Sequence, residues 1–412
     1  MRGRAMSSVI AMPSRTEWLQ DKMFMGLSLR DYVKSFLNPT DIVIGLILVT
    51  GFPIIAARFM YGLGAVTNLS QSNPWGLWIA FDVACGVALA AGGYTVACAV
   101  AIFGLKEYTP IMRPAVLTGM LGYLLVVLGL FVDLGRPWRL PYPLFWSAGT
   151  TSVMYELAWC VCLYLVVLIF EFLPAVLEWL GLKELRMKLA KLSIGAIVLG
   201  ISLSTLHQSS LGSLFLLAPT KLHPLWYSPF LPFFFFVSSI SAGIGMVIVE
   251  STISHRAFHD QLDPKKPVDI DKLTLGLAKG GALILFSIFF LRLQGVADGG
   301  HWNLLATPMG AWFLVEIVGF ILVPSLLFAW AVRYRNVLLA RIAAVMTVLG
   351  IILNRFNVSW LAFRWDAPDR YVPTVAEVIV SITIVTIGVA LFRWIVNRMP
   401  VMYEKPGYEG LH

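Results

Sequence analysis

The stretch WGLWIAFDVACGVALAAGGYTVACAVAIF (75–103) holds one charged residue, Asp82, among 29 positions. At about 1.5 Å per residue, a helix of this length is longer than the roughly 30 Å hydrocarbon core of a bilayer. A helix that is apolar on all sides is buried either in a large protein core or in a membrane. The stretch therefore predicts a membrane-spanning helix.

Apolar runs of the same kind recur along the 412 residues, of which 58% are hydrophobic and only 13% charged. One soluble core cannot bury so much apolar surface. A transmembrane barrel would instead show short alternating segments. We therefore predict an all-α, polytopic transmembrane bundle of about ten spans, near 41–62, 75–103, 114–132, 145–173, 189–206, 229–250, 274–294, 310–331, 338–353 and 374–397.

The chain divides into three predicted regions: an N-terminal segment (1–40), a transmembrane domain (41–397) and a C-terminal tail (398–412). The first segment has six basic residues but no long apolar run, so a cleaved signal peptide is not expected. Its residues 16–36 predict a weakly amphipathic surface helix. The sequence NPTD (38–41) then predicts a break and a cap before the first span.

The formal net charge of +8 raises nucleic acid as a partner, but the positions of the basic residues indicate another role. Most lysines and arginines lie in the two terminal segments and in alternate loops, around residues 106, 183–191, 256–272 and 333–341. The positive-inside rule places such segments in the cytoplasm. We therefore predict that both termini are cytoplasmic and that the basic charge sets topology, with no nucleic acid bound.

The five opposite loops are short and rich in aromatic residues, proline and glycine, as in GRPWRLPYPLFW (135–146) and LAPTKLHPLWYSPF (217–230). This composition is typical of an aromatic belt at the membrane interface and also of a rigid docking surface. No loop is long enough to fold as a catalytic domain. Any catalysis on a soluble substrate is therefore expected in partner subunits.

Cysteine and histidine positions argue against a metal site in this chain. All four cysteines lie within predicted spans without iron-sulfur or zinc spacing, which favours buried structural thiols. Of six histidines, only His207 lies near a predicted span. A haem held between two histidines on facing helices is therefore not predicted.

Polar residues inside predicted spans are the candidate functional residues, because such residues are costly in a membrane and usually functional. Asp82 is predicted about two turns inside its span and Tyr123 near the middle of the next. Glu156 is predicted close to mid-membrane. Asp133 with Arg136, and His207, are predicted at the outer face, and Glu250 at the inner face; Glu316, Arg355 and Glu377 complete the set.

A carboxyl group in low dielectric is usually protonated or paired, because ionising it there is costly. The series Glu250, Glu156, Asp133, Arg136 and His207 is therefore a candidate proton path from the cytoplasmic face to an outer pocket. Structural roles stay open for the same residues: hydrogen bonds between helices for Glu156 and Glu316, capping for His207, and an ion pair for Asp133 with Arg136. Small residues at 84–99 predict close helix packing, with room beside them for an isoprenoid tail.

Several motifs together resemble the NrfD/PsrC family, and within it the ten-span HybB-type membrane subunits of periplasm-facing nickel-iron hydrogenases. The resemblance covers most of the chain from Pro53 to Arg393. It rests on NPWGLWIAFDVACGVALAAGGY (73–94), MRPAVLTGMLGYLL (112–125), VDLGRPWRLPY (132–142), MYELAWC (154–160), LHQSSLGSL (206–214), HPLWYS (223–228) and VPTVAEVIVSI (372–382).

The resemblance implies a haem-free, quinone-binding anchor in the bacterial inner membrane, with menaquinone as the expected quinone and no iron-sulfur cluster in this chain. It implies periplasmic partners: an iron-sulfur, ferredoxin-like subunit and the small and large hydrogenase subunits, which hold the iron-sulfur and nickel-iron centres. The family's functional residues match Tyr123, Glu156, His207 and Glu250. The expected quinone-binding residues are Asp82, Asp133, Arg136 and His207.

One stretch departs from the family pattern: RWDAPDR (364–370) is charged where relatives are rich in glycine, which puts partner docking there in doubt. Two alternatives remain. A same-family quinone subunit can serve a polysulfide, nitrite or cytochrome-linked complex instead of a hydrogenase. A secondary transporter also has about ten spans with buried carboxylates, although a matched pair of glycine- or proline-interrupted spans is not evident.

Overall fold

The computed structural model describes residues 15–262 and 267–408. Ten helices in these ranges are long and apolar enough to cross a membrane, which confirms the predicted all-helical, polytopic fold. In order, the spans are α3 (Pro39–Tyr61), η2 with α4 and α5 (Trp78–Cys85, Gly86–Leu89, Gly92–Ala101), α6 (Thr109–Asp133), α8 (Val153–Leu180), α10 (Ser193–Ser213), α11 (Leu231–Ala257), α12 (Ile270–Asp298), α13 with η9 and α14 (Pro308–Leu314, Val315–Leu322, Val323–Tyr334), α15 with η10 (Val337–Phe356, Asn357–Leu361) and α16 (Val375–Val396).

Short helices connect or flank the spans: α1 (Arg15–Phe24), α2 (Leu29–Ser35), η1 (Leu63–Ala65), η3 (Lys106–Tyr108), η4 (Pro137–Arg139), α7 (Tyr142–Phe145), α9 (Lys183–Ala190), η5 (Leu214–Leu217), η6 (Pro219–Lys221), η7 (His259–Gln261) and η8 (His301–Ala306). An even number of spans puts both ends of the described chain at one face, here called the terminal face. The opposite face is called the loop face. That the terminal face is cytoplasmic stays a prediction.

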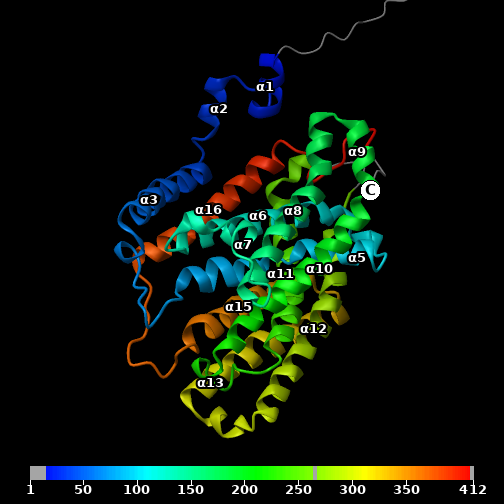
Figure 1. Cartoon of the computed structure of the whole chain (residues 1–412). Coiled ribbons are helices and arrows are strands. Elements are labelled where there is room, and N and C mark those ends of the chain that lie inside the picture. The colour runs from blue at the N-terminus through cyan, green and yellow to red at the C-terminus, as the bar shows by residue number, and fades with distance from the viewer. Residues whose placement is uncertain (1–14, 263–266, 409–412) are drawn as a thin grey trace, which may run out of the picture.

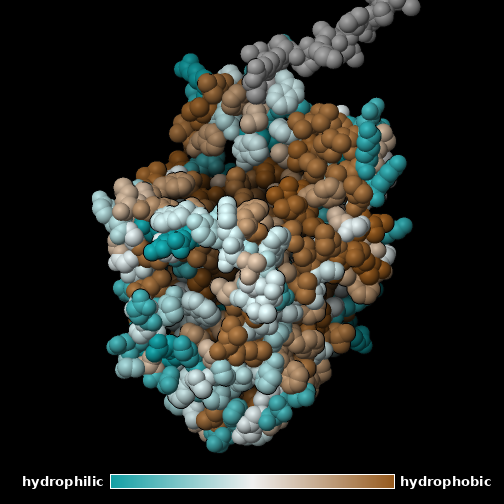
Figure 2. Space-filling model, viewed as in Figure 1, coloured by the Kyte–Doolittle hydropathy of each residue, from teal (hydrophilic) through white to brown (hydrophobic). Residues whose placement is uncertain are grey.

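The spans pack as two groups joined through α11 (Figure 1). Helices α5, α6, α8 and α10 contact one another in the first group, and α11, α12, α14 and α15 in the second. Helices α3 and α16 pair with each other beside α6. Figure 2 shows hydrophobic residues over much of the visible flank and hydrophilic ones gathered toward the loop face, as a membrane-embedded surface requires.

Three spans contain a π-helical segment: η2, η9 and η10. Each segment carries a buried polar residue, namely Asp82, Glu316 and Asn357 respectively. A π-helical turn inserts one extra residue into an α-helix and is frequent at functional sites. Here the segments redirect single polar side chains inward from otherwise apolar spans.

The predicted amphipathic helix over 16–36 is instead two helices, α1 and α2, and residues 1–14 lie outside the described chain. The break falls at Met25 and Gly26, both with positive φ. Ser28 then starts α2, because its hydroxyl accepts a hydrogen bond from the Asp31 backbone N–H. The pair is held to the end of α16 by Arg398, which donates to the Met23 carbonyl and the Tyr32 hydroxyl.

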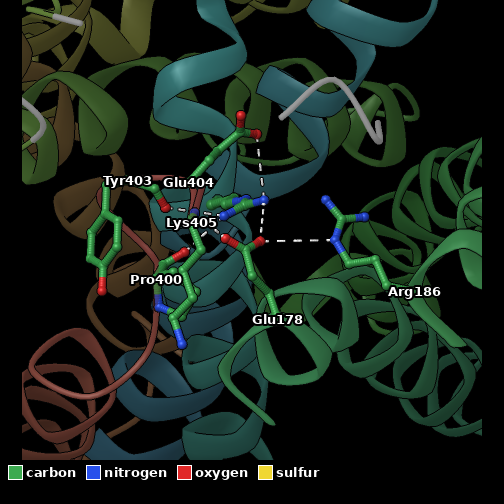
Figure 3. Close-up of polar contacts among 7 residues, drawn as sticks. Glu178, Arg186, Pro400, Tyr403, Glu404 and Lys405 are labelled. Atoms are coloured by element: carbon green, nitrogen blue, oxygen red, sulfur yellow. Dashed lines mark hydrogen bonds and ion pairs between the residues drawn. The ribbon is translucent and has the colours of Figure 1, made fainter. Parts of the chain in front are cut away.

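The C-terminal tail packs across the terminal-face ends of α6, α8 and α9 (Figure 3). Arg113 donates to the carbonyls of Pro400 and Tyr403 and, at 2.9 Å, to the fully buried carboxylate of Glu178. The Lys405 backbone N–H donates to the same carboxylate. Burial raises the pKa of Tyr403 and lowers that of Lys405. The tail, predicted only as a cytoplasmic extension, is thus part of the packed bundle.

Small residues allow α5 and α11 to cross closely, as the sequence of residues 84–99 predicts. A Cβ atom added at Gly243 would lie 2.7 Å from the Thr95 hydroxyl and 2.9 Å from the Ala91 backbone. The Ala91 backbone cannot move aside as a flexible side chain can. Gly243→Ala is therefore expected to lower the free energy of unfolding in mild detergent by about 1–3 kcal/mol.

Gly280→Ala is the matched control, because its Cβ would meet only Ile244 Cδ1, at an ordinary 3.6 Å. Alanine there is expected to be neutral or slightly stabilising. Equal unfolding free energies for the two variants would contradict the close crossing of α5 and α11.

Candidate functional site

A cavity with a volume of about 750 Å³ lies between η2, α4, α6, α11 and α16. Its walls are mostly apolar and include the small residues Gly86, Gly122 and Gly388. Asp82 lines it toward the loop face, and Glu250 toward the terminal face. A volume of this size is typical of small-molecule sites, which combine apolar walls with a few polar groups.

Asp82 is held by residues far from it in sequence. The Ser381 hydroxyl of α16 donates to its carboxylate at 2.7 Å, and Gly129 of α6 leaves room for its Cβ atom. Only 6% of Asp82 is exposed. It lies in the second turn of its span, within η2, so the prediction of a buried carboxyl near the loop-face boundary is confirmed.

Glu250 is two turns from the end of α11, not at its end as predicted. The polar run after it stays helical because its hydroxyls bond within the helix: Ser251 and Thr252 donate to the Ile248 carbonyl, and Ser254 donates to Glu250 at 2.5 Å. The other carboxylate oxygen of Glu250 is buried without a hydrogen-bond partner. A polar atom left without a partner in this way is costly and marks Glu250 as a residue whose environment needs a functional explanation.

Tyr123 of α6 and His207 of α10 are fully buried and hydrogen-bonded to each other. His207 Nδ1 lies 2.7 Å from the Leu203 carbonyl oxygen, which can only accept, so Nδ1 carries the proton. In the neutral imidazole Nε2 is then an acceptor, and the Tyr123 hydroxyl donates to it. The sequence predicted both residues but not that they form a pair.

His207 is also deeper than predicted, because α10 continues to Ser213. The hydroxyls of Ser209, Ser210 and Ser213 each donate to the carbonyl four residues earlier, which keeps the polar run helical. A capping role for His207 is therefore wrong. Its position is inside the first group of helices.

Three further polar residues surround the pair and were missed by the sequence analysis. The Tyr164 ring lies 4.7 Å from that of Tyr123 and 5.3 Å from that of His207, and its buried hydroxyl has no partner. Ser204 is buried with an unpartnered hydroxyl. Gln208 donates to the Val87 carbonyl and so connects α10 to the span that carries Asp82. Helical spacing could have indicated Ser204, three residues before His207 on α10, whereas Tyr164 lies on α8 and gave no such signal.

Glu156 is not near mid-membrane, as the sequence predicted, but exposed in the first turn of α8 at the loop face. The helix begins only at Val153, because residues 149–152 form a turn closed by the bond from the Ser152 N–H to the Gly149 carbonyl. The Ser210 hydroxyl oxygen lies 2.9 Å from a carboxylate oxygen of Glu156, and its one hydrogen is shared between that oxygen and the Leu206 carbonyl. The predicted helix-to-helix hydrogen bond is therefore present, but near the surface.

Asp133 and Arg136 are close in sequence but do not form one of the ion pairs found in the described chain. Asp133 is in electrostatic contact with Arg58, a buried arginine of α3 that the sequence analysis did not single out. Arg58 donates to the carbonyls of Val132 and Leu134. Arg136 is exposed, and neither predicted residue lines the cavity.

The loops at the loop face are joined to one another. Residues Leu222 and Phe363 form an antiparallel bridge, and the Trp75 ring stacks on Phe363 at 5.3 Å. Arg364, in the charged stretch that departs from the family pattern, donates to the Ser72 carbonyl. Burial also lowers the pKa of the His223 imidazole, which lies in one of these loops. This part of the stretch therefore stabilises the loop face.

The described residues include no group of three or more His, Cys, Asp or Glu side chains arranged to hold a metal ion. Both nitrogens of His207 are engaged, by Tyr123 and by Leu203. His255, predicted in a loop, lies in the last turn of α11, near the terminal face. His207 and His255 therefore lie at different depths. They do not form the pair of facing histidines that would hold a haem between helices.

With the helices and the cavity placed, comparison with known proteins gives the family. A family model described as polysulphide reductase, NrfD, matches residues 65–360. This chain belongs to the NrfD family. The match covers both groups of helices and the residues Asp82, Tyr123, His207 and Glu250.

Three relatives align along most of their own lengths. A protein of Nitratidesulfovibrio vulgaris is 48% identical over 92% of this chain and 98% of its own. The probable Ni/Fe-hydrogenase 2 b-type cytochrome subunit of Escherichia coli is 32% identical over 87% of this chain and 91% of its own. The integral membrane subunit of menaquinone reductase from N. vulgaris is 26% identical over 84% and 87%. The chain is thus a multi-pass membrane protein of a family of subunits of respiratory oxidoreductases.

Proposed function

We propose that this chain is the quinone-binding membrane anchor of an inner-membrane respiratory oxidoreductase, with a nickel-iron hydrogenase as electron donor and menaquinone as the quinone. The 750 Å³ cavity carries the proposal, because its apolar walls suit an isoprenoid quinone and its carboxyl groups suit a polar head. The hydrogenase-linked relative, at 32% identity, supports the donor. The menaquinone reductase relative supports the quinone.

In this proposal the quinone head lies near Asp82, toward the loop face. The Asp82 carboxyl is positioned by Ser381 and faces the cavity, so it is placed to donate a hydrogen bond or a proton to a quinone oxygen. Electrons arrive from an iron-sulfur subunit docked on the joined loops of the loop face, with the hydrogenase small and large subunits beyond it.

Reducing a quinone to a quinol takes two electrons and two protons, and the buried polar residues are suited to move the protons. The Tyr123 hydroxyl donates to His207 Nε2, so a proton can move between the phenol oxygen and the imidazole. Ser210 connects Glu156 at the loop face to the same helix, one turn from His207. Glu250 lines the cavity from the terminal face. Glu156 and the Tyr123–His207 pair are approached from the loop face, and Glu250 is approached from the terminal face. The described residues show no direct contact between Glu250 and Glu156.

A substitution that narrows the cavity from its membrane side tests the proposed quinone site. Val389 lines the cavity and is half exposed on α16, so Val389→Trp can add bulk without disturbing a packed core. In the purified complex, this variant is expected to raise KM about tenfold for a long-chain menaquinone, the equivalent of about 1.4 kcal/mol of binding. A short-chain analogue is expected to react as before. The readout is hydrogen-dependent quinone reduction.

Ile382→Trp is the control, because Ile382 is exposed to a similar degree on the same helix but does not line the cavity. If both variants behave alike, the cavity is not the quinone site. If the unmodified complex contains other oxidoreductase subunits, the donor is not a hydrogenase. A purified chain that moves a solute across vesicles without redox partners would overturn the quinone function and support a transporter.

A further inference from the structure

In the second group of helices, two buried arginines share one carboxylate. Glu316 is fully buried on η9, and Arg292 of α12 and Arg355 of α15 are only 5% and 1% exposed. Glu316 is in electrostatic contact with both guanidinium groups. Because arginine stays protonated in proteins, one carboxylate cannot balance the two charges.

The carboxylate of Glu316 accepts hydrogen bonds from three donors besides Arg292. The Trp226 indole N–H and the Asn357 amide donate to one oxygen, at 2.7 and 2.5 Å. The Asn354 amide donates to the other at 2.7 Å, and Arg292 reaches it at only 3.4 Å. Three of the roughly four acceptor positions of the carboxylate are taken, and Arg292 reaches the remaining one only through this long contact.

Arg355 has several acceptors, whereas Arg292 has one distant acceptor and otherwise faces the rings of Phe234 and Phe313. Arg355 donates to Asn354, to Ser238 and to the Phe235 carbonyl, and it lies over the Phe235 ring. For Arg292, the long contact to Glu316 is the one hydrogen bond found among the described residues, and its buried Nε has no partner. A buried charged donor left without an acceptor is costly.

A small cavity lies against Arg292. Its volume is about 20 Å³, and its only polar lining residues in the described chain are Arg292, Ser238 and Asn354. The rest of its wall is apolar, with Phe234 and Phe235 among the residues. Such a volume holds one water molecule or one small ion, and it excludes sulfate, carboxylates and larger anions.

We propose that this cavity binds a single halide ion, chloride in the cell, against the Arg292 guanidinium. A monovalent anion would give the two arginines and Glu316 a net charge of zero, which water in the same place cannot do. The site lies in the second group of helices and shares no lining residue with the 750 Å³ cavity. The inference therefore stands apart from the proposed quinone function.

The first test is thermal unfolding of the purified complex in mild detergent, with chloride replaced by gluconate at constant ionic strength. Binding to the folded state alone raises Tm in a saturable way. Chloride and bromide are expected to raise Tm by at least about 2 °C over gluconate. Arg292→Gln is expected to abolish the rise, and Arg292→Lys to keep it with a higher midpoint concentration.

Arg341→Gln is the matched control, because Arg341 pairs with Asp271 at the surface and does not line the cavity. It is expected to keep the full halide response. In case Arg292→Gln fails to fold, crystals of the unmodified protein in bromide give an independent readout. An anomalous peak beside Arg292 supports the site, and equal Tm values in chloride and gluconate with no such peak would overturn it.

Discussion

His207→Gln is expected to lower hydrogen-dependent quinone reduction by roughly 10²–10⁴-fold while leaving reduction of a soluble dye by the same complex unchanged. Proton transfer by a positioned side chain typically contributes a factor of this size. Glutamine can accept a hydrogen bond from Tyr123, but it cannot exchange a proton as the imidazole does. Tyr123→Phe removes the donor of the same pair and is expected to act in the same direction. The measurement compares both turnover rates in purified complexes.

The matched control is His255→Gln, on α11 near the terminal face and outside the pair. It is expected to keep quinone turnover within about twofold of the unmodified complex, since it removes no step of the proposed path. Equal losses in all three variants, or full turnover in His207→Gln and Tyr123→Phe, would contradict a role for the pair in proton transfer. Loss of assembly in both pair variants would indicate a structural role.

The spans were predictable because a run of apolar residues long enough to cross a bilayer is a local property of the sequence. The depth of the polar residues within those spans was harder to predict. His207 and Glu250 were placed at helix ends because polar residues follow them, yet serine and threonine hydroxyls bond to the preceding helical turn and let the helix continue. For Glu156 the error was opposite, since Phe145 and Trp146, where its predicted span begins, belong to the separate short helix α7 and its C-cap.

Partners between helices were beyond the sequence analysis, because a contact between distant segments leaves no local pattern. Asp82 is bonded to Ser381, which is 299 residues away, and Tyr123 to His207, which is 84 residues away. Asp133 was paired with its sequence neighbour Arg136, whereas its electrostatic contact is with Arg58 on α3. The residue types were recognisable as functional, since charges in a membrane are rare, but their grouping depends on how the helices pack.

Glu178→Ala is expected to cost about 3–5 kcal/mol of unfolding free energy, the largest stability effect we predict. The substitution leaves Arg113 without the carboxylate 2.9 Å from it and the Lys405 backbone N–H without its acceptor. The tail would then be held to α6 mainly through the Pro400 and Tyr403 carbonyls (Figure 3). Chemical unfolding in mild detergent measures the loss. Glu184→Ala, at an exposed position on neighbouring α9, is the control and is expected to change little.

The double variant Arg113→Met with Glu178→Leu separates a missing charge partner from a lost anchor. Replacing both members of a buried ion pair by apolar residues of similar size is often neutral, because no charge is left buried and unpaired. Here recovery should be partial, since the Pro400 and Tyr403 carbonyls lose the guanidinium that binds them, and the buried Arg186 loses the carboxylate 3.8 Å from it. Full recovery would mean that the tail does not depend on Arg113. Because α16 lines the large cavity and leads directly into this tail, a loosened tail should also weaken long-chain quinone binding.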